Sequence, residues 1–154
     1  MKLGALQYHF RTWEDLLRAL VGYIEDELKE SRRLRGLDES PTVSEIVAFL
    51  LDETASPNEV MLSHSFWLQL RAMEQVEPLV SDLLEEVYAE YMEILVGAME
   101  AAGFESPLGE ALCLMSVLEG ESLFTAKGKR WEGDKALVRK TIMQFVEARY
   151  GDKN

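Results

Sequence analysis

Apolar side chains recur at helical spacing along most of this chain, and this periodicity is the strongest constraint on its fold. The longest run lies between Thr12 and Gly36, and its apolar positions are Leu16, Leu17, Leu20, Ile24 and Leu28. The run predicts one long amphipathic helix that Gly36 ends. No segment alternates strictly between apolar and polar residues with turn residues at its ends, so a sheet is not expected. We expect an all-α fold.

Capping signals divide the rest of the chain into further helices. Thr42 and Glu45 have the spacing of a capping box before "IVAFLLDE", and Pro41 fits the first turn of the same helix. Ser56 and Glu59 have the same spacing before the next apolar run. Other helices are predicted to begin or end at Pro78, Gly103, Ser106, Pro107, Gly128, Asp134 and Gly151. The links are short, so we expect about six helices in a helical bundle, plus a stub at the start.

Length and composition favour one domain in an aqueous compartment. The chain has 154 residues and is 47% hydrophobic, which is enough for one core of ordinary size. Its apolar runs fall well short of the roughly 18 residues of a membrane span, and Arg11, Glu14 and Arg18 interrupt any signal peptide. The single cysteine, Cys113, cannot form an intrachain disulfide. We expect a cytoplasmic protein with no membrane partner.

The net charge of −12 is unevenly distributed along the chain. The first 35 residues carry seven Lys or Arg against six Asp or Glu, whereas the rest of the chain carries nine against 22. An acidic surface repels phosphate backbones. The bulk of the chain is therefore not expected to bind nucleic acid unaided.

The opening stretch "LGALQYHFRTWEDLLRAL" has a more specific pattern. It resembles the join between the recognition helix and the fourth helix of the tetracycline-repressor (TetR) family of transcriptional regulators. That join typically reads Gly, small, aliphatic, any, Tyr, His, Phe, a short turn, Lys, Glu, any, Leu, Leu. The matching residues here are Gly4, Ala5, Leu6, Tyr8, His9, Phe10, Glu14, Leu16 and Leu17. The remainder of the chain agrees with the family in its helix pattern only.

The resemblance implies an N-terminal three-helix DNA-binding module, a linking helix, and a helical domain that binds a small effector and dimerises. Residues 1–12 would then be a remnant of the recognition helix and turn, and residues 13–154 the linking helix with the effector-binding and dimerisation domain. By the same resemblance Tyr8 and His9 would donate to DNA phosphates, contacts that carry no sequence information; alternatively they are an ordinary surface pair. Trp13 stands where the family commonly has Lys.

The parts of a helix-turn-helix that read bases are absent from the sequence. As given, the chain is not expected to bind an operator specifically, and DNA would be a partner only if the missing N-terminal helices were present.

Aromatic, methionine and polar residues of the middle helices are candidates for a ligand pocket. Pockets in helical bundles are mostly apolar with a few convergent polar groups. Residues 64, 67 and 71 share one helical face, as do residues 88, 91, 92 and 95. The candidate ligand-binding residues are Met61, His64, Trp67, Tyr88, Tyr91, Met92, Met115 and Glu119. Each of them is alternatively an ordinary residue of the bundle core.

The last two helices are candidates for a homodimer interface. Both have wide apolar faces, and Gly120 would allow close helix approach. In the TetR family the corresponding helices pair with their twofold mates as a four-helix bundle. The candidate interface residues are Leu114, Leu118, Ile142, Phe145 and Val146. The alternative is that both faces are used by the core of one chain.

Catalysis finds no support in the sequence. With only His9 and His64 there is no Glu-x-x-His pair, and no zinc-protease, phosphate-loop or nucleophile-elbow motif occurs. We expect neither a catalytic centre nor a metal or cofactor. The favoured hypothesis is the ligand-binding and dimerisation region of a TetR-like regulator; the alternative is a helical dimeric interaction protein with no DNA or ligand function. The DNA upstream of Met1 would discriminate between them.

Overall fold

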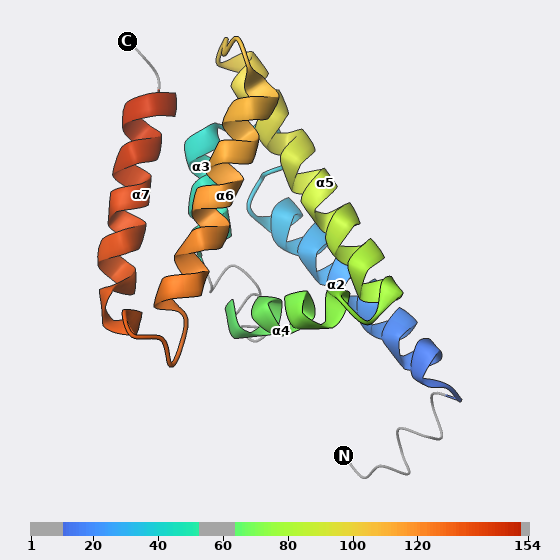
Figure 1. The fold of residues 1–154 in the computed structure, drawn as a ribbon. Coiled ribbons are helices and arrows are strands. Elements are labelled where there is room, and N and C mark those ends of the chain that lie inside the picture. The colour runs from blue at the N-terminus through green and yellow to red at the C-terminus, as the bar shows by residue number, and fades with distance from the viewer. Residues whose placement is uncertain (1–10, 53–63, 152–154) are drawn as a thin grey trace.

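The computed structural model of the protein describes residues 11–52 and 64–151, and within these ranges it contains helices and no strand. The all-α fold expected from the periodicity is thereby confirmed. The α-helices of the described ranges, with one short 3₁₀ turn before the last, are α2 (Trp13–Leu34), α3 (Val43–Leu51), α4 (His64–Glu74), α5 (Pro78–Ala101), α6 (Pro107–Thr125), η1 (Glu132–Asp134) and α7 (Lys135–Tyr150) (Figure 1).

Local hydrogen bonds start the first two of these helices where the sequence places them. The Glu45 N–H donates to Thr42 Oγ1 at 3.3 Å, and the Thr42 N–H donates to Glu45 Oε2 at 2.8 Å, so the expected capping box is confirmed. Thr12 and Asp15 form the same box at the start of α2. Pro41 was expected in the first turn of α3, which is wrong: Thr42 is the N-cap, so Pro41 lies before the helix.

Other helix ends follow residue conformational preferences. Pro78 and Pro107 occupy the first helical positions of α5 and α6, where the missing N–H of proline costs no hydrogen bond. Gly103 ends α5 with a φ of 79°, a left-handed conformation that glycine adopts without strain. The proposed Ser56–Glu59 box lies outside the described residues.

Helix α5 is the centre of the bundle. It packs against α2, α3, α4 and α6, while α7 packs against α3 and α6 (Figure 1). Leu95 and Met99 of α5 are fully buried, as are Ile46 of α3 and Val146 of α7. Helix α4 runs across the foot of the bundle in the view of Figure 1 and packs against α5. Among the described helices, none has both the length and the apolar character needed to cross a membrane.

Candidate ligand cavity

A cavity of about 110 Å³ lies where five helices meet. Helix α2 contributes only Leu28, and α4 contributes Trp67. Its other apolar and aromatic walls come from α3, α5 and α6, and they are Phe49, Leu50, Leu51, Val87, Tyr88, Tyr91, Met115 and Leu118. A mostly apolar concavity with aromatic walls is the usual surrounding of a small-molecule site in a helical bundle.

Three polar residues complete the lining: Asp52, Glu119 and Ser122. Asp52 ends α3 and pairs with Arg35, whose Nη2 lies 2.8 Å from Asp52 Oδ2. Ser122 Oγ donates to the backbone carbonyl of Glu119 at 3.0 Å. Among the described residues, no lysine or arginine belongs to the lining. The charged groups facing the cavity are therefore carboxylates.

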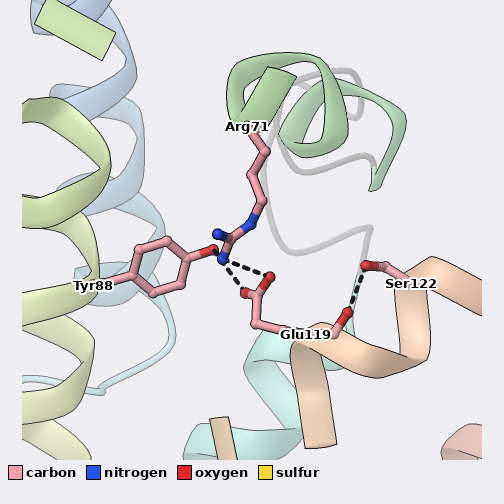
Figure 2. Close-up of polar contacts among 4 residues, drawn as sticks. All are labelled: Arg71, Tyr88, Glu119 and Ser122. Atoms are coloured by element: carbon pink, nitrogen blue, oxygen red, sulfur yellow. Dashed lines mark hydrogen bonds and ion pairs between the residues drawn. The ribbon is translucent and has the colours of Figure 1, made fainter. Parts of the chain in front are cut away.

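An arginine, a tyrosine and a glutamate from three different helices meet beside this cavity (Figure 2). Arg71 of α4 donates from Nη2 to Tyr88 Oη at 2.6 Å and to Glu119 Oε2 at 3.0 Å. Tyr88 Oη in turn donates to Glu119 Oε1 at 2.8 Å. The Arg71 guanidinium carbon also lies 4.9 Å from the centroid of the Tyr88 ring, within range of a cation–π contact. We call these three residues the polar triad.

The polar triad is held only loosely by electrostatics. The side chains of Arg71 and Glu119 are 40% and 39% exposed, and an ion pair so accessible to water contributes at most about 1 kcal/mol to stability. Tyr88 is the most enclosed of the three residues. Burial is the largest cause of the raised pKa of its hydroxyl, and the Glu119 carboxylate is the next. Arg71 acts in the opposite direction. Tyr88 therefore remains a protonated donor to Glu119 at neutral pH.

Tyr91 is the most buried of the aromatic residues that line the cavity. The residue is 5% exposed, and the centroid of its ring lies 6.2 Å from that of Phe49. The Arg32 guanidinium carbon lies 5.5 Å from the centroid of the Tyr91 ring, and Arg32 pairs with Glu90. Burial raises the pKa of Tyr91 to about 12, although Arg32 works in the opposite direction.

We expect these tyrosines to make the fold unstable in alkali. An unfolded tyrosine has a pKa of about 10, whereas the folded pKa values of Tyr88 and Tyr91 are raised. Their contribution to the free energy of unfolding is complete below the unfolded pKa. It is lost as pH rises from the unfolded towards the folded pKa, because only the unfolded chain loses protons between these two values. Urea unfolding at stepped pH should show the loss, and phenolate absorbance of the two tyrosines should appear together with unfolding. Tyr91→Phe should flatten the slope, and an unchanged slope would contradict the assignment.

The structure brings together five of the eight residues expected to bind ligand. They are Trp67, Tyr88, Tyr91, Met115 and Glu119, and all line the cavity. Met92 is half-buried and packs against the core, and it does not line the cavity although it lies one helical turn after Tyr88. Met61 and the side chain of His64 lie outside the described residues. Whether the five bind a ligand stays a prediction.

Arg71 is the most informative residue that the ligand prediction left out. It shares a helical face with Trp67, four residues earlier, and this spacing is the only sequence signal of its position. Asp52 and Phe49 were missed because nothing local indicates that the end of α3 closes the cavity. Ser122 follows Met115 and Glu119 at helical spacing, so the same periodicity predicts its face.

The expected dimer residues lie mostly inside one chain. Leu114, Leu118, Ile142 and Val146 are at most 8% exposed and belong to the core, whereas Phe145 is 46% exposed. A second copy can reach little of the four buried residues, so a pairing surface on these helices requires neighbouring positions. The large apolar residues exposed on α6 and α7 are Leu108, Leu112, Val117, Leu123, Phe124, Leu137 and Phe145.

The fully exposed positions of α6 carry no charged residue, although the half-exposed Glu119 lies beside them. Between the large apolar residues of this side stand small or weakly polar residues: Gly109, Cys113, Ser116 and Gly120. The three carboxylates of α6 each have an arginine partner within the chain, and the pairs are Glu110 with Arg149, Glu119 with Arg71 and Glu121 with Arg139. We call the apolar and small residues from Leu108 to Phe124 on this side the α6 outer face.

Tyr8 and His9, expected at the phosphate backbone, lie outside the described residues. Trp13 begins α2, and its Nε1–H donates to Glu77 Oε1 at 3.1 Å. Within residues 11–52 and 64–151, no group of three or more His, Cys, Asp or Glu side chains is placed to hold a metal ion.

The fold and cavity define a class of architecture: an all-α bundle with a cavity beside its central helix that is lined by aromatic residues and two carboxylates. Comparisons with protein-family models, with curated proteins and with solved structures find no match to this chain.

Proposed function

We propose that this chain is the ligand-sensing and dimerising region of a cytoplasmic, TetR-like transcriptional regulator. The observation that carries the proposal is the cavity beside the polar triad. Four aromatic side chains and two carboxylates line this cavity, and they come from helices far apart in sequence. The opening motif supplies the family resemblance. The helices that follow α2 supply the effector region that the resemblance implies.

The hydrogen bond between the side chains of Trp13 and Glu77 suggests how a ligand in the cavity would affect the start of α2. Helix α4 carries Trp67 and Arg71 at the cavity and ends shortly before Glu77, the N-cap of α5. Glu77 accepts from Trp13 at the start of α2, where the resemblance places the join to a DNA-binding module. If α4 can occupy two placements, a ligand that binds one of them more tightly would favour the α2 orientation that goes with it. Regulation requires such a difference in ligand affinity between the two states.

Homodimerisation completes the proposed function, because an operator with two half-sites requires two DNA-binding modules. The α6 outer face is the surface that suits a second copy: it is apolar, uncharged and contains small residues that permit close approach. The same face also favours the second candidate, a dimeric interaction protein without a ligand. The cavity is the feature that the second candidate leaves unexplained.

A fragment screen tests the proposal. Aromatic fragments of neutral, cationic and anionic character should include members that raise the melting temperature and shift the NMR signals of the Trp67 indole and the Met115 methyl. At a free concentration 100 times Kd, binding stabilises the fold by about 2.7 kcal/mol. The variant Leu50→Trp, which fills the cavity from a half-buried lining position, should lose both effects. If no fragment moves the Trp67 and Met115 signals, the sensing function is refuted.

A further inference from the structure

Resting on this proposed function, we propose that the cavity takes a monovalent organic cation with a flat apolar body. We further assign the position of its charge: the cation replaces the Arg71 guanidinium between the Tyr88 ring and the Glu119 carboxylate. In the absence of ligand, the Arg71 guanidinium occupies the position of the ligand cation.

The charges around the cavity carry the first step. Asp52 and Glu119 line it, while their arginine partners, Arg35 and Arg71, approach from beside it and are not part of the lining. An anion entering the cavity would face both carboxylates, and no described lining residue supplies a cation to replace its hydration. A cation that takes the place of Arg71 meets the charge of Glu119, while Asp52 keeps its Arg35 partner.

The aromatic walls carry the second step. Phe49, Trp67, Tyr88 and Tyr91 all line the cavity. Aromatic faces attract cations, and the attraction grows when water is excluded. The polar triad already demonstrates the geometry, because a planar cation lies 4.9 Å from the Tyr88 centroid while it donates to Glu119 at 3.0 Å (Figure 2). A ligand cation in that place would find the same two partners.

The exposure of the Arg71 side chain and the small volume of the cavity indicate that Arg71 is the residue of the polar triad that a ligand displaces. Its side chain is 40% exposed, so the guanidinium can turn into water without losing its solvation. Glu119 stays in place when Arg71 leaves, because the Tyr88 hydroxyl donates to it at 2.8 Å. The present cavity of about 110 Å³ is smaller than the roughly 150 Å³ that accommodates benzene. The Arg71 guanidinium lies against Tyr88 and Glu119, two lining residues, so its departure opens further space next to the cavity.

Three probes of nearly the same shape and different charge test the assignment in the full chain. They are phenyltrimethylammonium, its neutral isostere tert-butylbenzene, and the anion benzenesulfonate. Each is titrated against the protein, and the shifts of the Trp67 indole and Met115 methyl signals report binding in the cavity. We expect phenyltrimethylammonium to bind about tenfold more tightly than tert-butylbenzene, and benzenesulfonate to bind most weakly.

Two substitutions give effects of opposite sign. Glu119→Gln keeps an acceptor for Tyr88 and removes the charge, so the affinity for phenyltrimethylammonium should fall roughly tenfold while that for tert-butylbenzene is unchanged. Arg71→Gln removes the internal competitor, so the affinity for the cation should rise several-fold. Circular dichroism of both variants verifies that they are folded.

The chain contains a matched control for these substitutions. Glu110 also accepts from an arginine and a tyrosine, Arg149 and Tyr150, and the Arg149 guanidinium lies 5.7 Å from the Tyr150 ring. Glu110 does not line the cavity. Glu110→Gln should therefore leave the affinity for all three probes as in the wild type.

The outcomes separate the inference from the function on which it rests. If tert-butylbenzene or benzenesulfonate binds as tightly as phenyltrimethylammonium, or if Arg71→Gln weakens binding of the cation, the inference is overturned and the sensing function stands. If none of the probes and no library fragment moves the cavity signals, the sensing function fails and the inference fails with it.

Discussion

Replacing Leu95 by alanine is expected to lower the free energy of unfolding by roughly 3 to 5 kcal/mol. Leu95 is fully buried on α5, the helix against which α2, α3, α4 and α6 all pack. Truncation removes buried apolar contacts, and the surrounding helices relax only partially into the space left behind. Urea denaturation followed by far-ultraviolet circular dichroism, at one fixed protein concentration, measures the change.

Leu34 provides the matched control for this prediction. It ends α2, is also a helical leucine, and is 58% exposed. Leu34→Ala should change the free energy of unfolding by no more than about 0.5 kcal/mol. A loss below about 1 kcal/mol for Leu95→Ala would mean that α5 is not the centre of the core.

The helices were predictable because their signals are local. The capping box of Thr42 and Glu45 is completed within one turn, and the left-handed glycine at Gly103 is a property of one residue. Neither depends on where another helix lies. The error at Pro41 is of the same local kind. Proline fits the first turn in general, but here the Thr42 N–H donates to Glu45 in the capping box, so Thr42 is the N-cap and the helix begins at Val43.

The cavity was predictable only in part because it is assembled by distant segments. Aromatic residues such as Tyr88 and Tyr91 stand out on one face of α5, so composition and periodicity point to them. The role of Arg71 depends instead on its approach to Glu119, 48 positions later in the chain. No pattern within either helix predicts that contact, and a lone arginine on a helix is usually a solvated residue.

The dimer residues illustrate a related difficulty. Leu114 and Leu118 repeat at four-residue spacing and so does the pair Leu108 and Leu112, so α6 has two apolar faces. Periodicity identifies both faces and does not say which one a neighbouring helix covers. Packing against α5 and α7 buries the first face and leaves the second exposed.

The largest effect on assembly is therefore expected from Leu112 and not from the buried leucines. If the α6 outer face forms a twofold dimer, Leu112→Glu introduces one charge from each copy into the apolar interface, and burying an unpaired carboxylate is costly. We expect the dimer Kd to rise at least about 100-fold, equivalent to about 2.7 kcal/mol. Analytical ultracentrifugation over a range of concentrations measures this directly.

The substitution should spare the fold of each copy, which separates loss of pairing from unfolding. Leu112 is 53% exposed, and glutamate is nearly as favourable as leucine within a helix. Leu34→Glu tests whether any added charge has the same effect, because Leu34 is equally exposed on a helix outside the α6 outer face, and its dimer Kd should match the wild type. Two results would exclude this face as the interface: a monomeric wild type at high concentration, or equal Kd values for Leu112→Glu and Leu34→Glu. In the first case the uncharged surface of α6 would have to serve a different partner, and regulation through paired half-sites would lose its physical basis.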